Sequence, residues 1–246
     1  MPASAGIFIN KHFMQSLPPS FTLQEYIQYL PSQGNVGCCT ASATLLSAEI
    51  IMATHGQKIN LSRLYLYYMT RKLQNRLGLH GAELKETLNA LSIYGVATDA
   101  TWPFFYAWAE KEPNMRAIQD AARHKLYSYE WADSIDFKKH IVNHIPIIIG
   151  IGTGKMFWRL KGQFEKHAYV PINTTNNKQY KGHAVTIIGY DDNLNGGSWI
   201  IANSVGPKWG CRGYAAIPYS CNADIGESYI ITNFAGIIAG KKIYEN

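Results

Sequence analysis

The pattern of apolar residues changes character near residue 126. Before it, residues 39–55 are apolar on nearly every face and contain neither Gly nor Pro, which predicts a buried helix. Residues 61–73 and 83–94 also have helical periodicity, with more polar faces. Beyond residue 126, runs rich in β-branched residues predict strands, at 145–151, 183–190, 198–202 and 214–218.

Helices followed by strands predict an α+β fold made of two lobes. We expect an N-terminal extension at residues 1–16, a mainly helical lobe at 17–125 and a mainly antiparallel β lobe at 126–246. A run of turn-forming residues at 191–197 joins two of the predicted strands, which indicates that they form an antiparallel hairpin.

The composition limits the classes of partner. With 246 residues, of which 47% are hydrophobic and 16% charged, the chain can build a sizeable core and is not disordered. Its net charge of +6 reflects scarce acids rather than clusters of Lys and Arg, so nucleic-acid binding is not expected. Because no apolar stretch approaches the ~20 residues of a membrane span, we expect a soluble monomer without a membrane partner.

Cysteine and histidine spacing gives no sign of a metal site. Cys38 and Cys39 are adjacent and make a poor bonded pair, so at most one ordinary disulfide is plausible, between Cys211 and Cys221. His140 lies one helical turn before another histidine, but no Glu follows it, and the cysteines lack the paired spacing of zinc ligands. We therefore expect neither a metal nor a cofactor.

The predicted hairpin brings a histidine and an asparagine together. If residues 191–197 form its loop, the numbers of paired residues sum to about 388, which places His183 opposite residues 203–205. Side chains on one face of such a pair lie ~5 Å apart, so Asn203 is within reach. An amide oxygen that accepts from one imidazole nitrogen fixes the tautomer and leaves the other nitrogen to act on a third group, which should be a nucleophile.

We expect that nucleophile at the start of the buried helix. Cys38 and Cys39 stand at its N-terminus, where the helix dipole is expected to lower the pKa of a thiol. Gln33 precedes Cys39 by six residues and can supply an amide N–H that joins the Cys39 backbone N–H in an oxyanion hole. Gly34 and Gly37 permit the close backbone approach of such a turn. In this register Cys39 faces the cleft, while Cys38 packs in the core.

Three motifs in the chain resemble those of the papain-like cysteine peptidases, the C1-type family. They are Gln33-Gly34-x-x-Gly37-x-Cys39, then Gly182-His183-Ala184-Val185 with Ile188-Gly189-Tyr190, then Ser198-Trp199-Ile200-Ile201-Ala202-Asn203-Ser204 with Trp209-Gly210-x-x-Gly213-Tyr214. The order Cys, His, Asn is also the family's, and 144 residues separate Cys39 from His183, within the roughly 130 to 150 of these enzymes.

Further similarities indicate a bacterial-type branch of the family. They are Leu17-Pro18 through Tyr26, Cys39-Thr40-Ala41, Trp102-Pro103 and Ile217-Pro218-Tyr219. With them the resemblance covers about residues 17–220.

The resemblance implies a papain-like two-lobed fold in which the active-site cleft separates a helical lobe from an antiparallel β-barrel-like lobe. Cys39 is then the nucleophile, and His183 is its base and later the acid for the leaving amine. Asn203 orients the imidazole, and Gln33 contributes to the oxyanion hole. The implied activity is hydrolysis of a peptide or protein substrate through a thioester acyl-enzyme. Two alternatives stay open: a catalytically inactive binding module with this fold, and an acyl transferase that uses the same Cys-His-Asn site.

The chain departs from the family pattern at three positions. Val205 stands where the family has the Trp that shields the His–Asn hydrogen bond, although Trp209 is kept. Val36 replaces a structural Cys of the nucleophile loop, so the usual disulfide of that loop cannot form. Thr40 replaces the common Trp after the nucleophile. The first departure motivates the inactive binding module.

The N-terminal sequence favours a secreted or extracellular protein. Residues 3–5, Ala-Ser-Ala, have the small-x-small pattern of a signal-peptidase cleavage remnant. An intact signal peptide, with a basic segment before an apolar core, is absent from this chain.

Overall fold

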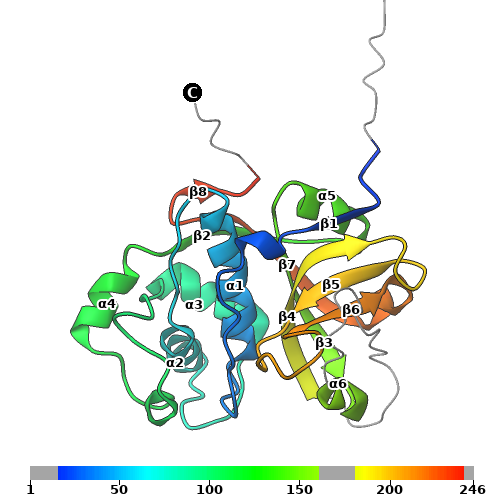
Figure 1. Cartoon of the computed structure of the whole chain (residues 1–246). Helices are drawn as coiled ribbons and strands as arrows, with labels where there is room; N and C mark the ends of the chain where they lie inside the picture. The colour runs from blue at the N-terminus through cyan, green and yellow to red at the C-terminus, as the bar shows by residue number, and fades with distance from the viewer. Residues whose placement is uncertain (1–15, 161–180, 241–246) are drawn as a thin grey trace, which may run out of the picture.

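The computed structural model describes residues 16–160 and 181–240 (Figure 1). The predicted N-terminal extension and the candidate cleavage remnant therefore lie, apart from residue 16, outside the described residues. The helices are α1 (Cys39–Ala53), α2 (Arg63–Leu73), α3 (Leu84–Tyr94), α4 (Met115–Ala121), α5 (Phe137–Val142) and α6 (Lys155–Arg159), with short 3-10 helices η1 (Gln24–Tyr26), η2 (Tyr106–Trp108), η3 (Ser134–Asp136) and η4 (Tyr219–Asp224). The strands are β1 (Ser20–Thr22), β2 (Leu126–Trp131), β3 (Ile147–Thr153), β4 (Lys181–Asp191), β5 (Ser198–Ala202), β6 (Tyr214–Pro218), β7 (Ile225–Phe234) and β8 (Ile237–Ile238).

The three predicted helices are confirmed as α1, α2 and α3, each within two residues of its expected ends. Local signals set the boundaries. Ser62 caps α2, because its Oγ accepts the backbone N–H of Tyr65 at 3.2 Å. Gly95, whose φ of +69° favours glycine, ends α3. Among the described residues, no helix combines the length and hydropathy of a membrane span.

The buried helix α1 lies between the helical lobe and the sheet (Figure 1). Leu45 and Ala48 belong to the core that it forms with α2 and α3. Leu46 and Ile50 belong to a second core, built mainly by the sheet. A helix without a polar face is stable when both of its sides are covered, so the apolar sequence of α1 is explained by its place between two cores.

All the strands of the described residues join one antiparallel sheet. Its order is β2-β7-β3-β4-β5-β6, with β1 paired to β4 and β8 to β7. The predicted strands are confirmed as β3, β4, β5 and β6, whereas the sequence pattern does not predict β1, β2, β7 or β8. The α+β fold is thus confirmed, and the sheet is open between its ends at β2 and β6 rather than closed like a barrel.

The hairpin of β4 and β5 has the predicted register at its open end. Thr186 pairs with Ala202 and Ile187 with Ile201, and each pair of numbers sums to 388. A bulge before Gly189 then shifts the remaining pairs by one residue. Because the shift lies on the loop side of these pairs, it leaves the placement of His183 opposite the end of β5 unchanged.

The two ends of the described chain tie the lobes together. β1, from the predicted helical half, pairs with β4 of the sheet. In the other direction, Ile231 and Phe234 of β7 belong to the core around α2 and α3. Each lobe is therefore completed by a segment from the opposite half of the sequence.

The plausible disulfide between Cys211 and Cys221 is not formed, since all four cysteines are free thiols. Cys211 belongs to a tight turn before β6, where its backbone N–H donates to Tyr214 O at 2.7 Å. Cys221 lies beyond β6, in η4, and packs against the sheet core. The strand between the two cysteines places them in separate local structures.

Candidate active site

His183 and Asn203 meet as the hairpin register predicts. His183 Nε2 lies 2.8 Å from Asn203 Oδ1, and both side chains are buried. The backbone N–H of Ser204 donates to the same Oδ1 at 2.8 Å. Because a backbone N–H can only donate, this contact identifies the atom as the amide oxygen, so His183 Nε2 must carry a hydrogen. The lone pair of the neutral imidazole then lies on Nδ1.

A chain of hydrogen bonds connects Asn203 to Gln33. Asn203 directly follows β5, and its backbone N–H donates to Gly213 O at 2.9 Å. The next residue, Ser204, donates its hydroxyl to Gln33 Oε1 at 2.5 Å, and its carbonyl oxygen accepts the Gln33 backbone N–H at 2.6 Å. Ser204 therefore positions both the asparagine and the glutamine. The sequence motif contains Ser204, but spacing alone did not reveal this role.

The loop that carries Gln33 is closed by hydrogen bonds. Gln33 Nε2 donates to Val36 O at 2.8 Å, and the Val36 backbone N–H donates to Gln33 O at 3.1 Å. One hydrogen of the Gln33 amide group is thus used inside the loop, which leaves the other for a ligand. The Val36 side chain packs in the core, at the position where the family has its structural Cys.

Gly34 and Gly37 sit where other chain segments approach closely, as expected. Gly34 has a φ of +51°, and a Cβ there would lie 1.5 Å from Tyr106 Oη. A Cβ on Gly37 would lie 2.7 Å from both His80 Nε2 and Gly81 N. Since neither position has room for a side chain, the loop before α1 can pack against its neighbours only with glycine there.

The two adjacent cysteines have different surroundings. Cys39 is the first residue of α1, is partly exposed and lines the cleft. Cys38 is fully buried, and its Sγ lies 3.9 Å from Ser42 Oγ. The structure thus agrees with the expected register, in which Cys39 faces the cleft and Cys38 packs in the core.

Burial dominates the acid–base properties of the site. It raises the pKa of Cys39 above the ordinary value for a thiol, although backbone N–H groups, including that of Ala184, lower it in part. Backbone groups at the start of α1 do lower this pKa, as expected, but desolvation outweighs them and the net shift is upward. Burial likewise lowers the pKa of His183 to about 4, against the hydrogen bond that His183 donates to Asn203, which raises it. Both shifts favour the uncharged forms of thiol and imidazole.

A cleft of about 610 Å³ contains Cys39 and His183. Its lining comes from α1, the start of α3 and the sheet, and comprises Cys39, Thr40, Ala82, Glu83, Leu84, Gly150, Ile151, Gly152, Gly182, His183, Ala184, Asp224, Gly226 and Glu227. Behind it, Thr186 Oγ1 on β4 donates to Ala43 O on α1 at 3.0 Å. This bond ties the helix of Cys39 to the strand of His183, so that the two side chains open into one cleft.

Two aromatic side chains of α6 pack against His183, and the sequence motifs did not predict them. The ring centroid of His183 lies 5.5 Å from that of Phe157 and 4.9 Å from that of Trp158, both in edge geometry. Trp209, the tryptophan that the family pattern keeps, packs on Phe157 with ring centroids 5.0 Å apart. No periodicity or spacing signal links α6 to the histidine strand, because their contact is made only by folding.

The chain is similar in sequence to known cysteine proteases. A sequence model described as papain family cysteine protease matches residues 17–233. An uncharacterized peptidase C1-like protein of Acanthamoeba polyphaga mimivirus is 28% identical over 207 residues, which cover 78% of this chain and 65% of that protein. A senescence-specific cysteine protease of Arabidopsis thaliana is 28% identical over 193 residues, which cover 76% of this chain and 52% of that protein. The chain thus spans between about half and two thirds of the length of these relatives.

Solved structures confirm the papain-like two-lobed fold. Xylellain, a cysteine protease from Xylella fastidiosa, superposes with a TM-score of 0.73 at 26% identity, over 88% of this chain and 86% of that one. Digestive procathepsin L 3 of the Tenebrio molitor larval midgut shares the fold, with a TM-score of 0.70 at 19% identity, over 89% of this chain and 71% of its own. With the family pattern matched from residue 17 to residue 233, this chain belongs to the papain family of cysteine proteases.

Proposed function

We propose that the protein is a cysteine peptidase that hydrolyses peptide bonds with Cys39 as nucleophile. The observation that carries the proposal is the pairing of His183 with Asn203 at the wall of the cleft that Cys39 also lines. With Nε2–H bonded to Asn203, Nδ1 is the basic nitrogen of the imidazole. Membership of a family of cysteine proteases supports the same conclusion.

In the proposed mechanism His183 Nδ1 accepts the Cys39 proton while Sγ attacks the carbonyl carbon of the substrate. The oxyanion accepts hydrogen bonds from the Cys39 backbone N–H and from the remaining hydrogen of Gln33 Nε2. The tetrahedral intermediate then breaks its C–N bond, and the proton on Nδ1 passes to the leaving amine. Water attacks the resulting thioester with His183 as base, which releases the carboxylic acid product and returns a proton to Cys39.

Turnover of an internally quenched peptide library by the purified chain distinguishes this proposal from its alternatives. Release of fluorescence supports the peptidase, whereas a folded chain without turnover on the whole library supports the inactive binding module. Adding an amine acceptor tests the transferase, because adducts that form faster than hydrolysis products would show transfer of the acyl group.

The pH dependence of turnover should be bell-shaped and broad. The active site holds one proton shared by Cys39 and His183, so activity is lost when a second proton binds or when the last one leaves. Because the pKa of His183 is lowered to about 4, the acid limb is expected near pH 4. Because burial raises the pKa of Cys39, the alkaline limb is expected above the ordinary thiol range. Measuring kcat/KM from pH 3 to 11 with one peptide checks both limbs, and a flat profile would contradict the pair.

Asn203→Leu tests the direction in which the acid limb of this profile moves. Leucine has the same number and branching of side-chain heavy atoms as asparagine but accepts no hydrogen bond, so the interaction that raises the pKa of His183 is lost. The acid limb should therefore move to lower pH, while kcat falls because the imidazole is no longer oriented. An acid limb that stays in place would show that Asn203 does not act on His183.

We also propose that the cleft prefers a substrate with a basic side chain close to the cleaved bond. Glu83, Asp224 and Glu227 line the cleft, and no Lys or Arg is among its described lining residues. Burial and the charge of Glu83 raise the pKa of Glu227, although Tyr229 and Lys85 oppose the shift. Glu83 already lies 3.5 Å from an Arg76 nitrogen, so the preference is argued from Glu227: a cationic group beside its carboxylate would favour the charged form and offset the repulsion from Glu83.

This preference is testable with peptides that differ only in one residue, Arg, Leu or Glu, on either side of the cleaved bond. We expect kcat/KM to be highest for Arg and its advantage to shrink at high salt. Glu227→Gln should reduce the advantage by about tenfold. Glu86→Gln, on α3 but outside the cleft lining, is the matched control and should leave it unchanged. Equal kcat/KM values for all three peptides would refute the proposed preference.

A further inference from the structure

We propose that Trp158 is a positioning residue that shields the hydrogen bond between His183 and Asn203 from water. The role rests on the proposed peptidase mechanism, in which this bond holds the imidazole. It is the role that the family resemblance gives to the position occupied here by Val205. The assignment follows from the ring contacts of α6 with His183.

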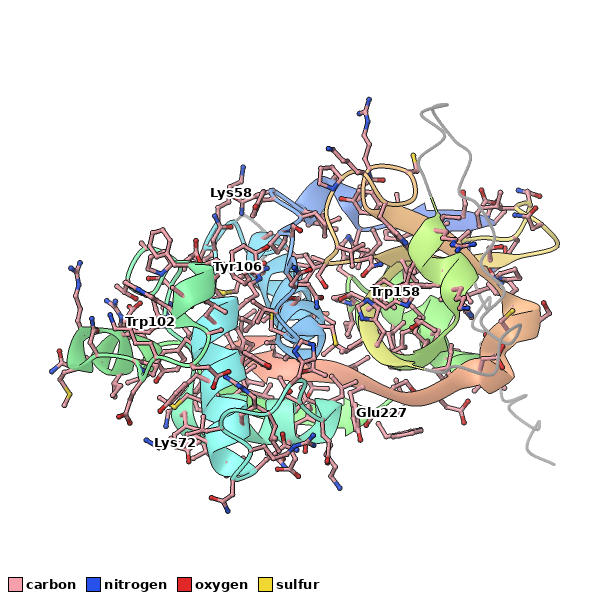
Figure 2. The ribbon with its side chains drawn as sticks, turned by 90° about the horizontal axis from the view of Figure 1, so that it is seen from below. Lys58, Lys72, Trp102, Tyr106, Trp158 and Glu227 are labelled. Atoms are coloured by element: carbon pink, nitrogen blue, oxygen red, sulfur yellow. The ribbon has the colours of Figure 1, made fainter. Side chains whose placement is uncertain are left out.

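Trp158, labelled in Figure 2, belongs to α6 and packs its ring against that of His183. Its ring centroid lies 4.9 Å from that of His183, at an interplanar angle of 65°. Its Nε1 donates to Thr153 Oγ1 at 3.1 Å, and Thr153 ends the strand that pairs with β4. The ring is therefore tethered to the sheet that carries His183. With 42% of the residue exposed, Trp158 is the outer layer between the imidazole and solvent.

Phe157 forms the inner layer. It is fully buried, and its ring contacts both His183 and Trp158. Trp209, the tryptophan that the family pattern keeps, supports this layer, since its Nε1 donates to Phe157 O at 2.6 Å. The short helix α6 thus places two rings on the imidazole, and Trp209 holds the inner one in place.

Val205 does not shield the His183–Asn203 hydrogen bond in the same way. Its short branched side chain has no ring to lay over the imidazole, and its backbone is engaged in a bridge with Ser32. A hydrogen bond that is open to water competes with solvent, whereas one in a dry environment holds its partners more firmly. The departure from the family pattern at Val205 is therefore offset by Trp158, from a different segment of the chain.

The test is the titration of His183, followed by NMR in the full chain labelled with ¹⁵N-histidine and assigned with His183→Ala. In Trp158→Ala, water should reach the imidazole. Burial lowers the pKa of His183 more than the hydrogen bond with Asn203 raises it, so relief of burial should outweigh a weaker hydrogen bond. The pKa should therefore rise toward the ordinary value, and the acid limb of kcat should move to higher pH. We expect kcat at neutral pH to fall about two- to tenfold. Trp158→Phe keeps a ring and should titrate like the parent chain.

The titratable and charged side chains around His183 are unchanged in every variant. They are Cys39, Glu83, Asp224 and Glu227 in the cleft, and Lys155 and Arg159 on α6. A shift of the His183 titration therefore reports on hydration rather than on a changed neighbour. Trp131→Ala removes a ring that is 60% exposed on β2 and is the matched control, for which we expect no shift.

A rescue variant distinguishes shielding from packing. Val205→Trp in the Trp158→Ala background should restore both the titration and the turnover. The inference is overturned if His183 titrates unchanged in Trp158→Ala, even when turnover falls, because the ring would then serve the substrate or the fold. The titration does not depend on catalysis: a parent chain without turnover refutes the peptidase proposal, while the shift in Trp158→Ala still decides the shielding.

Discussion

Replacing Cys39 by alanine is expected to reduce peptide hydrolysis by at least about 10⁴-fold without loss of the fold. The thiol is the only group at this position that can form the proposed thioester, and it lies on the cleft wall with partial exposure. Its removal leaves the backbone N–H of residue 39 and the Gln33 amide in place, so substrate binding should persist. Turnover of a quenched peptide and binding of the same peptide, measured side by side, check both expectations.

Cys38→Ala is the control for this variant, because it changes the neighbouring thiol. Cys38 is buried, and its surroundings raise its pKa to about 12, so it should be inert at neutral pH. We expect this variant to keep most of its turnover, and iodoacetamide to label Cys39 and not Cys38 in the native chain. Activity that survives Cys39→Ala but not Cys38→Ala would refute the assigned nucleophile.

Replacing Glu49 by alanine is expected to destabilise the fold by about 3–5 kcal/mol. Glu49 is the one charged residue of α1, and it forms a bidentate ion pair with Arg63, with distances of 2.5 and 2.6 Å. It also accepts the Leu61 backbone N–H at 2.7 Å. Both partners of the ion pair are buried, with 10% and 6% of their side chains exposed. Without the carboxylate, Arg63 would stay charged in the interior without its partner.

Thermal unfolding measures this effect as a fall in Tm of about 6 to 20 °C. The exposed ion pair between Lys72 and Glu112 supplies the matched control, since Glu112→Ala should cost only about 0–1 kcal/mol. A double variant, Glu49→Leu with Arg63→Met, should recover much of the loss, because it leaves no unpaired charge. If Glu49→Ala were as mild as Glu112→Ala, the buried pair would not be holding α1 to α2.

The hairpin shows how far sequence reasoning can reach. Its loop residues and the period of two along each strand were enough to place His183 opposite the end of β5, because pairing across a tight loop leaves little freedom in register. The structure confirms pairs that sum to 388 and brings His183 within 2.8 Å of Asn203. The buried helix was equally predictable, since fifteen residues without Gly, Pro or a polar face have few alternatives.

Other expectations failed where the outcome depends on packing. The pKa of Cys39 is raised although the residue begins a helix, because the amount of burial cannot be read from position in a helix. Strand β7 was missed, although it pairs with three other strands, β2, β3 and β8. The expected barrel-like lobe is an open sheet because β2 and β7 extend it toward the helical lobe instead of closing it.

The sequence by itself determined the order of the three long helices and of strands β3 to β6, the register of Cys39 and the pairing of His183 with Asn203. Each of these depends on spacing along one helix, one loop or one hairpin, where chain geometry links near neighbours. Tertiary structure alone decided the bond from Ser204 to Gln33, the acidic lining that Glu83 and Glu227 give the cleft, and the cover of His183 by Trp158. These features join segments far apart in the chain, and their energies come from burial and contact, which exist only once the two lobes have packed together.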